Sequence, residues 1–402
     1  MIELKDIREA AERLKVVLAD TPFAYGPFLS QMCGMSVFLK KENLQIIGSF
    51  KLRGAFNRVA TLSQRDRERG VITASAGNHA QGVAFAARYF GIKSFIAMPD
   101  ATPLLKVNAT RDMGAKVLLH GLNYDEAYLY AENYCREHDL SFIHPFADDG
   151  VIAGQGTLAL EMLAAAPDLD AILVPVGGGG LISGIAVGAK AINPKIKIIG
   201  INASGANSAR NSFIAKKPVN SASVRTIADG IAVRDCSPLT LEYILKYVDE
   251  MIEVDDEEIA SAILFLIEKQ KLVVEGAGAV GVAALMHKKS GLKQKSKVGV
   301  ILSGGNIDVT MLSVIIEKGL VKASRKMNLV VTLIDKPGSL QKLSASLSSA
   351  KANIVQIDYD RTAISLDYGD AYVSVSLETK GAEHQEEIRS RLKEDNFIFS
   401  EA

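Results

Sequence analysis

Cysteine and proline are scarce in this sequence. The three cysteines among its 402 residues, Cys33, Cys135 and Cys236, lie far apart and form no CxxC pair. This usage argues against a disulfide framework and a structural zinc site, and it favours a reducing compartment. Only 11 prolines accompany 48% hydrophobic and 23% charged residues. Such a composition excludes a disordered or fibrous chain and leaves ample material for a core.

Net charge and long apolar runs are also absent. The 46 Lys and Arg residues balance the 46 Asp and Glu residues, so no surplus of positive charge is available to gather nucleic acid. No apolar run approaches the ~20 residues of a membrane span, and the N-terminus lacks the basic-then-apolar pattern of a signal peptide. We therefore expect a cytoplasmic protein of two or three domains, without nucleic-acid or membrane partners.

Most of the chain alternates short apolar strands with helical periodicity. The strands are continuously apolar, which is typical of parallel strands buried on both faces, and the alternation predicts an α/β fold with more than one such sheet. The expected strands are Val71–Ala74, Ser94–Met98, Lys116–Leu119, Ala171–Val176, Ile196–Ile201 and Val298–Leu302, and the expected helices are Ala80–Tyr89, Asp125–His138, Thr157–Ala166 and Leu181–Ile192.

The pattern changes near the C-terminus. A half-buried strand, a turn, a helix, two strands and a second helix are expected, in this order, at Met327–Ile334, Asp335–Ser339, residues 340–347, Ile354–Tyr359, Ala371–Leu377 and Glu383–Leu392. This βαββα(β) unit of about 75 residues has the size of a small α+β domain. We place the linker at residues 320–326, between a domain of residues 1–320 and a second of residues 326–402.

Four consecutive glycines carry the strongest local signal. Gly177, Gly178, Gly179 and Gly180 separate an apolar strand from a helix that starts at Leu181. Residues without Cβ let backbone N–H groups converge on an anion, and the helix N-terminus adds partial positive charge. The segment lacks the third glycine and later acid of a dinucleotide fold, and also the Gly-Lys-Ser/Thr of a Walker loop. We therefore expect the phosphate of a small cofactor here; a flexible connector is the alternative.

A lysine near the N-terminus is the candidate nucleophile. Lys51 lies beside Phe50, between a Gly-Ser turn and an expected helix. In a partly apolar site a lysine has a lowered pKa, and its free amine can form a Schiff base. A lysine whose stem lies along the protein surface gives the same local pattern, so this segment alone leaves both interpretations open.

Two further turns follow expected strands. The turn at residues 75–79 can receive a carboxylate on its exposed N–H groups, with simple helix capping as the alternative. Within it, we interpret His79 as an orienting or packing residue rather than a base. The second turn is Ser303–Asn306. Because open α/β sheets bind ligands at the C-terminal ends of their strands, we expect these turns and the glycines to form one site. The six histidines show no metal-ligand spacing, so no metal is expected.

These motifs, in this order, resemble a known family. The segments Ser49–Ala55, Ser75–His79, Gly177–Gly180 and Ser303–Asn306 are similar to those of the pyridoxal-phosphate enzymes of the tryptophan-synthase β fold (fold type II), and within them of the threonine dehydratases (threonine ammonia-lyases). The resemblance covers roughly residues 5–320. It implies a catalytic domain of two subdomains, the smaller at roughly residues 48–148. The C-terminal unit resembles a ligand-sensing ACT domain.

The resemblance implies a role for each motif. Lys51 would hold pyridoxal 5'-phosphate as a Schiff base and take the α-proton of the substrate, and the glycines would bind the phosphate. Asn78 would hydrogen-bond the ring hydroxyl, Ser303 would face the pyridine nitrogen, and the turn at residues 75–79 would receive the substrate carboxylate. The implied cofactor-binding set is Phe50, Lys51, Asn78, Gly177, Gly178, Gly179, Gly180, Leu181 and Ser303, and the implied substrate-binding set is Ser75, Ala76, Gly77, Asn78 and His79.

The implied reaction converts L-threonine to 2-oxobutanoate and ammonia, in isoleucine biosynthesis or threonine catabolism. L-Serine is an expected second substrate, because one methyl group gives only about 1–3 kcal/mol of discrimination. A serine dehydratase or racemase of the same fold and a catalytically idle amino-acid sensor are the alternatives. Related racemases carry a second serine at the position of Ala76, which has no proton to exchange. The resemblance also implies that isoleucine or valine binds the C-terminal unit, around Asp335–Leu340, and regulates the enzyme allosterically. The alternative role of that unit is oligomerisation. In either case a homo-oligomer is expected.

Four positions need separate comment. Ile47 stands where the family usually has threonine or a small residue, and Asn202 where related sequences tend to have a glutamate of a cation site. Losing that oxygen ligand weakens the case for a divalent ion, and we interpret Asp229 as a turn-capping residue. Glu275 resembles a family residue lining the cofactor pocket, but a helix-starting acid is nearly as good an interpretation.

Overall fold

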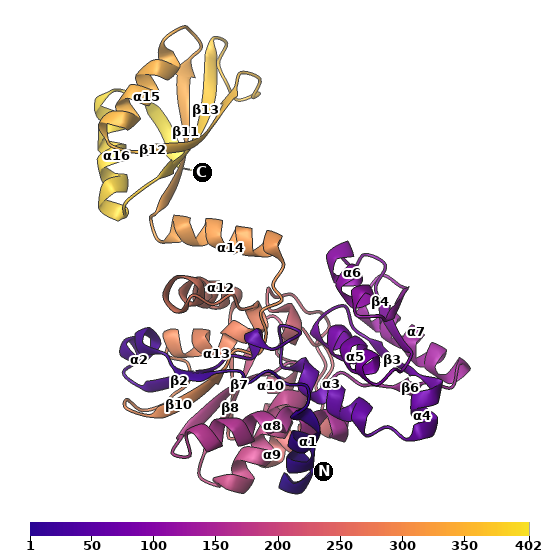
Figure 1. Ribbon diagram of the computed structural model, residues 1–402. Helices are drawn as coiled ribbons and strands as arrows, with labels where there is room; N and C mark the ends of the chain where they lie inside the picture. The colour runs from indigo at the N-terminus through magenta and orange to yellow at the C-terminus, as the bar shows by residue number, and fades with distance from the viewer. Residues whose placement is uncertain (402) are drawn as a thin grey trace. The chain divides into compact units, whose positions relative to one another are not determined.

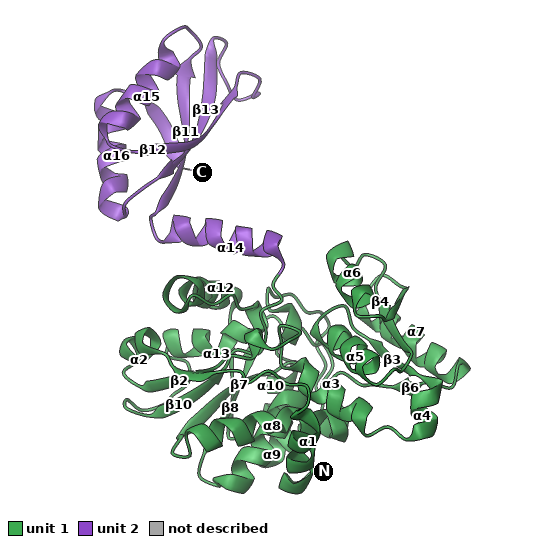
Figure 2. Ribbon diagram, viewed as in Figure 1, with its two compact units in different colours: residues 1–307 green, residues 308–402 purple. Residues whose placement is uncertain are grey.

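The computed structural model describes residues 1–401, and the chain divides into two compact units, residues 1–307 and 308–402 (Figures 1 and 2). The helix α14 (Val309–Lys322) belongs to the second unit. The linker expected at residues 320–326 falls at the end of this helix. The sequence-based division therefore assigns α14 to the first domain, whereas the structure assigns it to the second unit. Among the described residues, no helix has both the length and the apolar character that crossing a membrane requires.

A six-stranded sheet forms the centre of the first unit. Its order is β1-β2-β10-β7-β8-β9, and all neighbours are parallel except β1 and β2. Every residue of β7 is buried, which agrees with the continuously apolar sequence expected of a central parallel strand. The strands are β1 (Phe23–Tyr25), β2 (Ser36–Lys40), β7 (Ala171–Pro175), β8 (Lys197–Ala203), β9 (Glu250–Val254) and β10 (Lys297–Ile301).

A second, four-stranded parallel sheet has the order β5-β4-β3-β6. Three of its strands were predicted with the observed bounds. All its strands and the neighbouring helices α3 to α7 fall within residues 48–148, the range expected for the small subdomain. The elements are α3 (Lys51–Ala60), α4 (Gln64–Arg69), β3 (Val71–Ala74), α5 (Asn78–Tyr89), β4 (Ser94–Met98), α6 (Leu104–Asp112), β5 (Lys116–Leu119), α7 (Tyr124–Glu137) and β6 (Ser141–Phe142).

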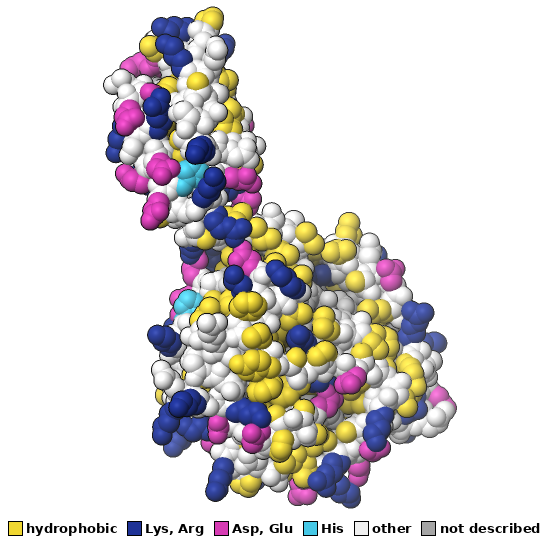
Figure 3. Space-filling view, turned by 60° about the vertical axis from the view of Figure 1, so that its left-hand side comes forward, with side chains coloured by type: hydrophobic (Ala, Val, Ile, Leu, Met, Phe, Trp, Pro, Cys, Tyr) yellow, Lys and Arg dark blue, Asp and Glu magenta, His cyan; other side chains and the backbone are white. Residues whose placement is uncertain are grey.

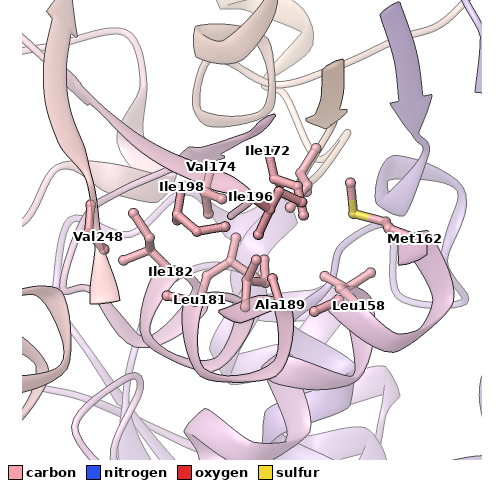
Figure 4. Packing of buried hydrophobic residues seen from close by; sticks show 14 of the residues in the cluster. Leu158, Met162, Ile172, Val174, Leu181, Ile182, Ala189, Ile196, Ile198 and Val248 are labelled. Carbon is pink, nitrogen blue, oxygen red and sulfur yellow. The ribbon is translucent and has the colours of Figure 1, made fainter. Parts of the chain in front are cut away.

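Helices cover both faces of the six-stranded sheet, with α9 on one face and α13 on the other (Figure 1). Figure 4 shows part of the resulting core, where Leu158 and Met162 of α8 lie near Ile172 of β7. Basic and acidic side chains are interspersed on the face of this unit seen in Figure 3. The remaining helices and turns are α1 (Leu4–Leu14), α2 (Pro27–Cys33), η1 (Glu42–Leu44), α8 (Asp149–Ala165), α9 (Gly180–Ile192), α10 (Ser208–Ala215), η2 (Asp229–Ile231), α11 (Pro238–Tyr247), α12 (Asp256–Phe265), η3 (Leu266–Gln270) and α13 (Gly276–Met286).

After α14, the second unit contains an antiparallel sheet of order β12-β13-β11-β14. One face of β11 and β13 is buried and the other is partly exposed, in strict alternation, as expected of a sheet covered by helices on one side. The βαββαβ order agrees with the α+β prediction. The elements are β11 (Lys326–Ile334), α15 (Ser339–Ser349), β12 (Asn353–Asp360), β13 (Asp370–Glu378), α16 (Ala382–Glu394) and β14 (Ile398–Glu401).

Candidate active site

Lys51 is the first residue of α3, and its side chain is partly buried. Its Nζ atom donates a hydrogen bond to the carbonyl oxygen of Pro145 at 2.9 Å and lies 5.5 Å from the centre of the Phe50 ring. Burial lowers the pKa of Lys51 to about 8, although the negative charge of Glu275 opposes this shift. At this pKa about a tenth of the amine is uncharged at pH 7, far more than for an ordinary lysine, and a Schiff-base lysine reacts in this free form.

The four glycines connect β7 to α9 and leave a surface of bare backbone. Gly179 has a φ of +88°, a left-handed conformation that favours glycine. A Cβ on Gly178 would lie 2.3 Å from the Phe146 ring, and one on Gly180 would lie 2.8 Å from the Phe146 carbonyl oxygen. Larger residues are thus excluded sterically. Together with the first N–H groups of α9, which include that of Leu181, this loop fits the phosphate of a cofactor.

Asn78, at the start of α5, connects two other parts of the site. Its Nδ2 atom donates to both carboxylate oxygens of Glu275, at 2.9 and 3.1 Å, and its Oδ1 atom accepts from Asn306 at 2.7 Å. Glu275 is 3% exposed, and burial raises the pKa of its carboxyl to about 7, against the lowering effect of the Asn78 hydrogen bonds. The turns after β3 and β10 therefore meet at one place, as expected for the C-terminal ends of parallel strands.

The rest of the turn after β3 offers backbone N–H groups. Ser75 Oγ accepts a hydrogen bond from the N–H of Gly77 at 3.2 Å, and Ala76 is partly buried. His79 is buried, and its Nε2 atom bonds the carbonyl oxygen of Ile143 at 3.0 Å. Desolvation, together with the nearby Lys51 charge, lowers the pKa of His79 to about 3. A neutral, buried imidazole favours the orienting or packing interpretation over that of a base.

Ser303 lies two residues beyond the end of β10 and beside the loop before Lys51. It is 2% exposed, and its carbonyl oxygen accepts a hydrogen bond from the N–H of Phe50 at 3.0 Å. The adjoining Gly304 pairs with Ser49 in an isolated β-bridge. A Cβ on Gly304 would lie 2.5 Å from a carboxylate oxygen of Glu275. The serine turn is thus joined to both Lys51 and Glu275 through the backbone.

Two residues near the site, His144 and Asn306, have contacts that the sequence motifs do not predict. His144 Nδ1 accepts from the N–H groups of Phe146 and Ala147, at 3.2 and 2.8 Å, and burial lowers its pKa to about 4. Asn306 bonds Asn78. Asn306 lies within the Ser303–Asn306 motif, but its contact with Asn78 joins segments far apart in the sequence and leaves no local signal.

The positions interpreted as departures from the family have ordinary partners. The Asn202 side chain donates to the carbonyl oxygen of Val176 at 2.7 Å and accepts from the N–H of Arg210 at 3.1 Å. Asp229 forms an ion pair with Lys106 at 3.0 Å, and Ile47 is buried in a hydrophobic cluster. Within residues 1–401, no group of three or more His, Cys, Asp or Glu side chains could hold a metal ion.

Comparisons with known proteins agree with this site. The family described as "pyridoxal-phosphate dependent enzyme" matches residues 15–304. An L-threonine ammonia-lyase of Thermotoga maritima is 48% identical over 98% of this chain and 97% of its own length, and one of Geobacter sulfurreducens is 46% identical over 96% of each chain. The solved threonine deaminase isoform 2 of Solanum lycopersicum is 37% identical, with a TM-score of 0.74 over 78% of this chain and 86% of its own. Maize serine racemase is 36% identical, with a TM-score of 0.75 over 80% of this chain and 98% of its own. The chain therefore belongs to the family of pyridoxal-phosphate dependent enzymes.

Proposed function

We propose that this chain is an L-threonine ammonia-lyase, which converts L-threonine to 2-oxobutanoate and ammonia. The observation that carries the proposal is the amine of Lys51, whose pKa burial lowers to about 8 at the start of α3. Two relatives with this activity in their names match the chain over nearly their whole lengths. The family and the bare glycine loop agree on pyridoxal phosphate as the cofactor.

Each group of site residues has its own proposed role. We propose that Lys51 binds the cofactor aldehyde and carries the α-proton of the substrate, while Gly177–Gly180 and Leu181 hold the phosphate. Asn78 would bond the ring hydroxyl, and Ser303 would face the ring nitrogen. The turn at residues 75–79 would orient the substrate carboxylate. When bound, pyridoxal phosphate supplies the electron sink that makes the α-proton acidic.

The overall chemistry balances without a further reactant. L-Threonine loses its α-proton and its β-hydroxyl group, which leave as one water molecule. The resulting enamine tautomerises to an imine, and water then releases ammonia and 2-oxobutanoate. No oxidant or reductant is consumed.

A racemase is the second candidate, because maize serine racemase shares this fold at a TM-score of 0.75. Racemisation needs a proton donor on the opposite face of the substrate, and Ala76 offers no exchangeable proton there. We therefore expect dehydration of L-threonine, with L-serine as a slower substrate, and little racemisation.

We further propose that residues 308–402 form an ACT-like regulatory unit responding to isoleucine or valine in a cytoplasmic homo-oligomer. Within this unit, Asp335 accepts a hydrogen bond from the Tyr359 hydroxyl at 3.0 Å and pairs with Arg361 at 3.2 Å. Three free cysteines fit a reducing compartment. A Staphylococcus aureus relative is named as a catabolic L-threonine dehydratase, and its match spans 80% of this chain and 93% of its own length. Regulation requires that the effector bind two states of the enzyme unequally.

A keto-acid assay tests the activity. With pyridoxal phosphate and L-threonine, the wild-type protein should form 2-oxobutanoate and ammonia in equal amounts, and Lys51→Ala should form neither. Chiral analysis of recovered L-serine should show little D-serine. Racemisation without keto acid would replace the proposal by the racemase, and inactivity of a cofactor-loaded protein on both amino acids would reject it. Unchanged kinetics and melting with branched-chain amino acids would reject the regulatory role.

A further inference from the structure

We propose that Asn306 is a positioning residue that fixes which end of the Asn78 side-chain amide faces the cofactor. The proposal rests on the pyridoxal-phosphate site described above and adds a residue to it. Asn306 itself would not touch the reacting atoms. It acts through Asn78, the residue proposed to bond the ring hydroxyl.

Asn306 is bonded to three parts of the site at once. Its Nδ2 atom donates to the carbonyl oxygen of Ile47 at 2.8 Å and to Oδ1 of Asn78 at 2.7 Å. Its backbone also hydrogen-bonds the carboxylate of Glu275. The residue thus joins the loop before Lys51, the start of α5 and the start of α13.

The carbonyl oxygen of Ile47 sets the orientation of both side-chain amides, because it can only accept a hydrogen bond. A backbone carbonyl such as that of Ile47 only accepts hydrogen bonds, so the Asn306 atom facing it must be the nitrogen. The Asn306 oxygen then lies toward Gly48, where a Cβ would approach it to 2.4 Å. Because the same nitrogen faces Asn78, the Asn78 atom opposite must be the oxygen. The Asn78 nitrogen is therefore turned to Glu275.

Glu275 cannot set this orientation alone. Burial raises the pKa of its carboxyl to about 7, so near neutral pH it exists both as an acceptor-only carboxylate and as an acid that can donate. An Asn78 amide facing only Glu275 could turn either way. With Asn306 in place, the Asn78 oxygen stays occupied. The Nδ2 atom of Asn78 carries two hydrogens, so it can keep one on Glu275 and offer the other, rather than a carbonyl oxygen, to the phenolic oxygen of the cofactor.

Two substitutions separate polarity from shape. Asn306→Asp keeps the size of the side chain but replaces the donor by a carboxylate, so the Asn78 amide should turn and present its oxygen to the cofactor. Asn306→Ala only removes the donor, and water can replace it because Asn306 is exposed. We expect the dissociation constant of pyridoxal phosphate, titrated by its visible absorbance, to rise about tenfold for Asn306→Asp and about threefold for Asn306→Ala. The isosteric change should thus be the more harmful one.

Two controls isolate the cause. Asn306→Asp/Glu275→Gln restores the wild-type charge, yet the carboxylate at position 306 still accepts from Asn78, so cofactor binding should stay weak. Asn133→Asp makes the same chemical change far from these contacts, at an exposed residue of α7. The Asn133 side chain accepts a hydrogen bond from Arg136. This variant should bind pyridoxal phosphate as tightly as the wild type does. The melting temperature of each cofactor-free variant, measured in parallel, shows that it is folded.

Three results would overturn the proposal. The first is cofactor binding within twofold of wild type for Asn306→Asp, and the second is weaker binding by Asn306→Ala than by Asn306→Asp. The third is recovery of binding in the double variant, which would identify charge repulsion as the cause. Because every comparison is with wild-type cofactor binding, a wild type that binds pyridoxal phosphate but does not act on threonine would refute the proposed function and leave this test intact.

Discussion

The Nζ atom of Lys51 donates a hydrogen bond to the carbonyl oxygen of Pro145 at 2.9 Å, although the two residues lie 94 positions apart. A carbonyl accepts from an ammonium group, more strongly, and also from a neutral amine, so this contact fixes the position of Lys51 in either charge state. The charge depends on burial, which lowers the pKa to about 8. The structure therefore holds a nucleophilic amine in place before any cofactor binds.

The pH dependence of cofactor loading follows from this pKa. The free amine is the nucleophile, so the rate at which the cofactor-free protein gains visible absorbance with pyridoxal phosphate should rise with pH and level off above about 8. An unperturbed lysine would level off only above about 10.4. In Glu275→Gln, which removes the opposing negative charge, the plateau should begin at a lower pH. A wild-type plateau near pH 10 would contradict the buried amine.

His79 should make the protein sensitive to acid. Its pKa is about 3 in the folded protein and about 6.5 in an unfolded chain. Both states are neutral above pH 6.5, but between about 6.5 and 3 the unfolded chain takes up a proton that the folded protein excludes. Relative to His79→Asn, the wild type should thus lose up to about 1.4 kcal/mol of unfolding free energy per pH unit below 6.5. Urea unfolding at several pH values checks this, and a constant difference between the two proteins would refute it.

Gly178→Ala should impair the phosphate site. The added Cβ would lie 2.3 Å from the Phe146 ring, so the glycine loop or the ring must move, at a cost of about 1–3 kcal/mol. We expect the dissociation constant of pyridoxal phosphate to rise about tenfold or more. Gly26→Ala is the matched control, because its Cβ would make only an ordinary contact with Leu39 at 3.5 Å. Equal affinity in both variants would argue against the loop as the phosphate site.

Arg53, two residues after Lys51, stabilises the start of α3 through a buried ion cluster. Its side chain is fully buried, bonds both carboxylate oxygens of Glu42 at 2.8 Å and also pairs with Glu161. Arg53→Met leaves the buried Glu42 charge unpaired and should destabilise the fold by about 3–5 kcal/mol. The double variant Arg53→Met/Glu42→Met should recover a large part of that loss.

Urea unfolding measures this effect, with Arg65→Met as the control. Arg65 is exposed, and its replacement should change the unfolding free energy by no more than about 0.5 kcal/mol. A double variant as unstable as Arg53→Met would show that the packing of the arginine, rather than the unpaired carboxylate, determines stability.

Much of the fold could be predicted because buried parallel strands are continuously apolar. The strands β3, β4 and β5 have the predicted bounds. Helix α8 was predicted to start at Thr157 but starts at Asp149, because glycines in its first turns hide the helical pattern. Close packing requires them: a Cβ on Gly154 would lie 2.4 Å from the Arg53 carbonyl oxygen. Strand β9 was missed because its polar residues resemble those of a loop.

The candidate site could be predicted in part. The glycines and the turn at Asn78 follow strand ends, and Lys51 lies at the start of a helix, where sequence patterns are informative. The Asn78–Asn306 hydrogen bond joins residues 228 positions apart, and the partly protonated state of Glu275 depends on its burial. A local sequence motif predicts neither the hydrogen bond nor the burial, so both were found only in the structure.

Borohydride reduction of the protein with bound pyridoxal phosphate, followed by peptide mapping, tests the central claim most directly. The account predicts one stable pyridoxyl label, on the Nζ atom of Lys51, and none on Lys106, the lysine paired with Asp229 near the site. A label on any other lysine, or no label on a protein that has bound the cofactor, would contradict it.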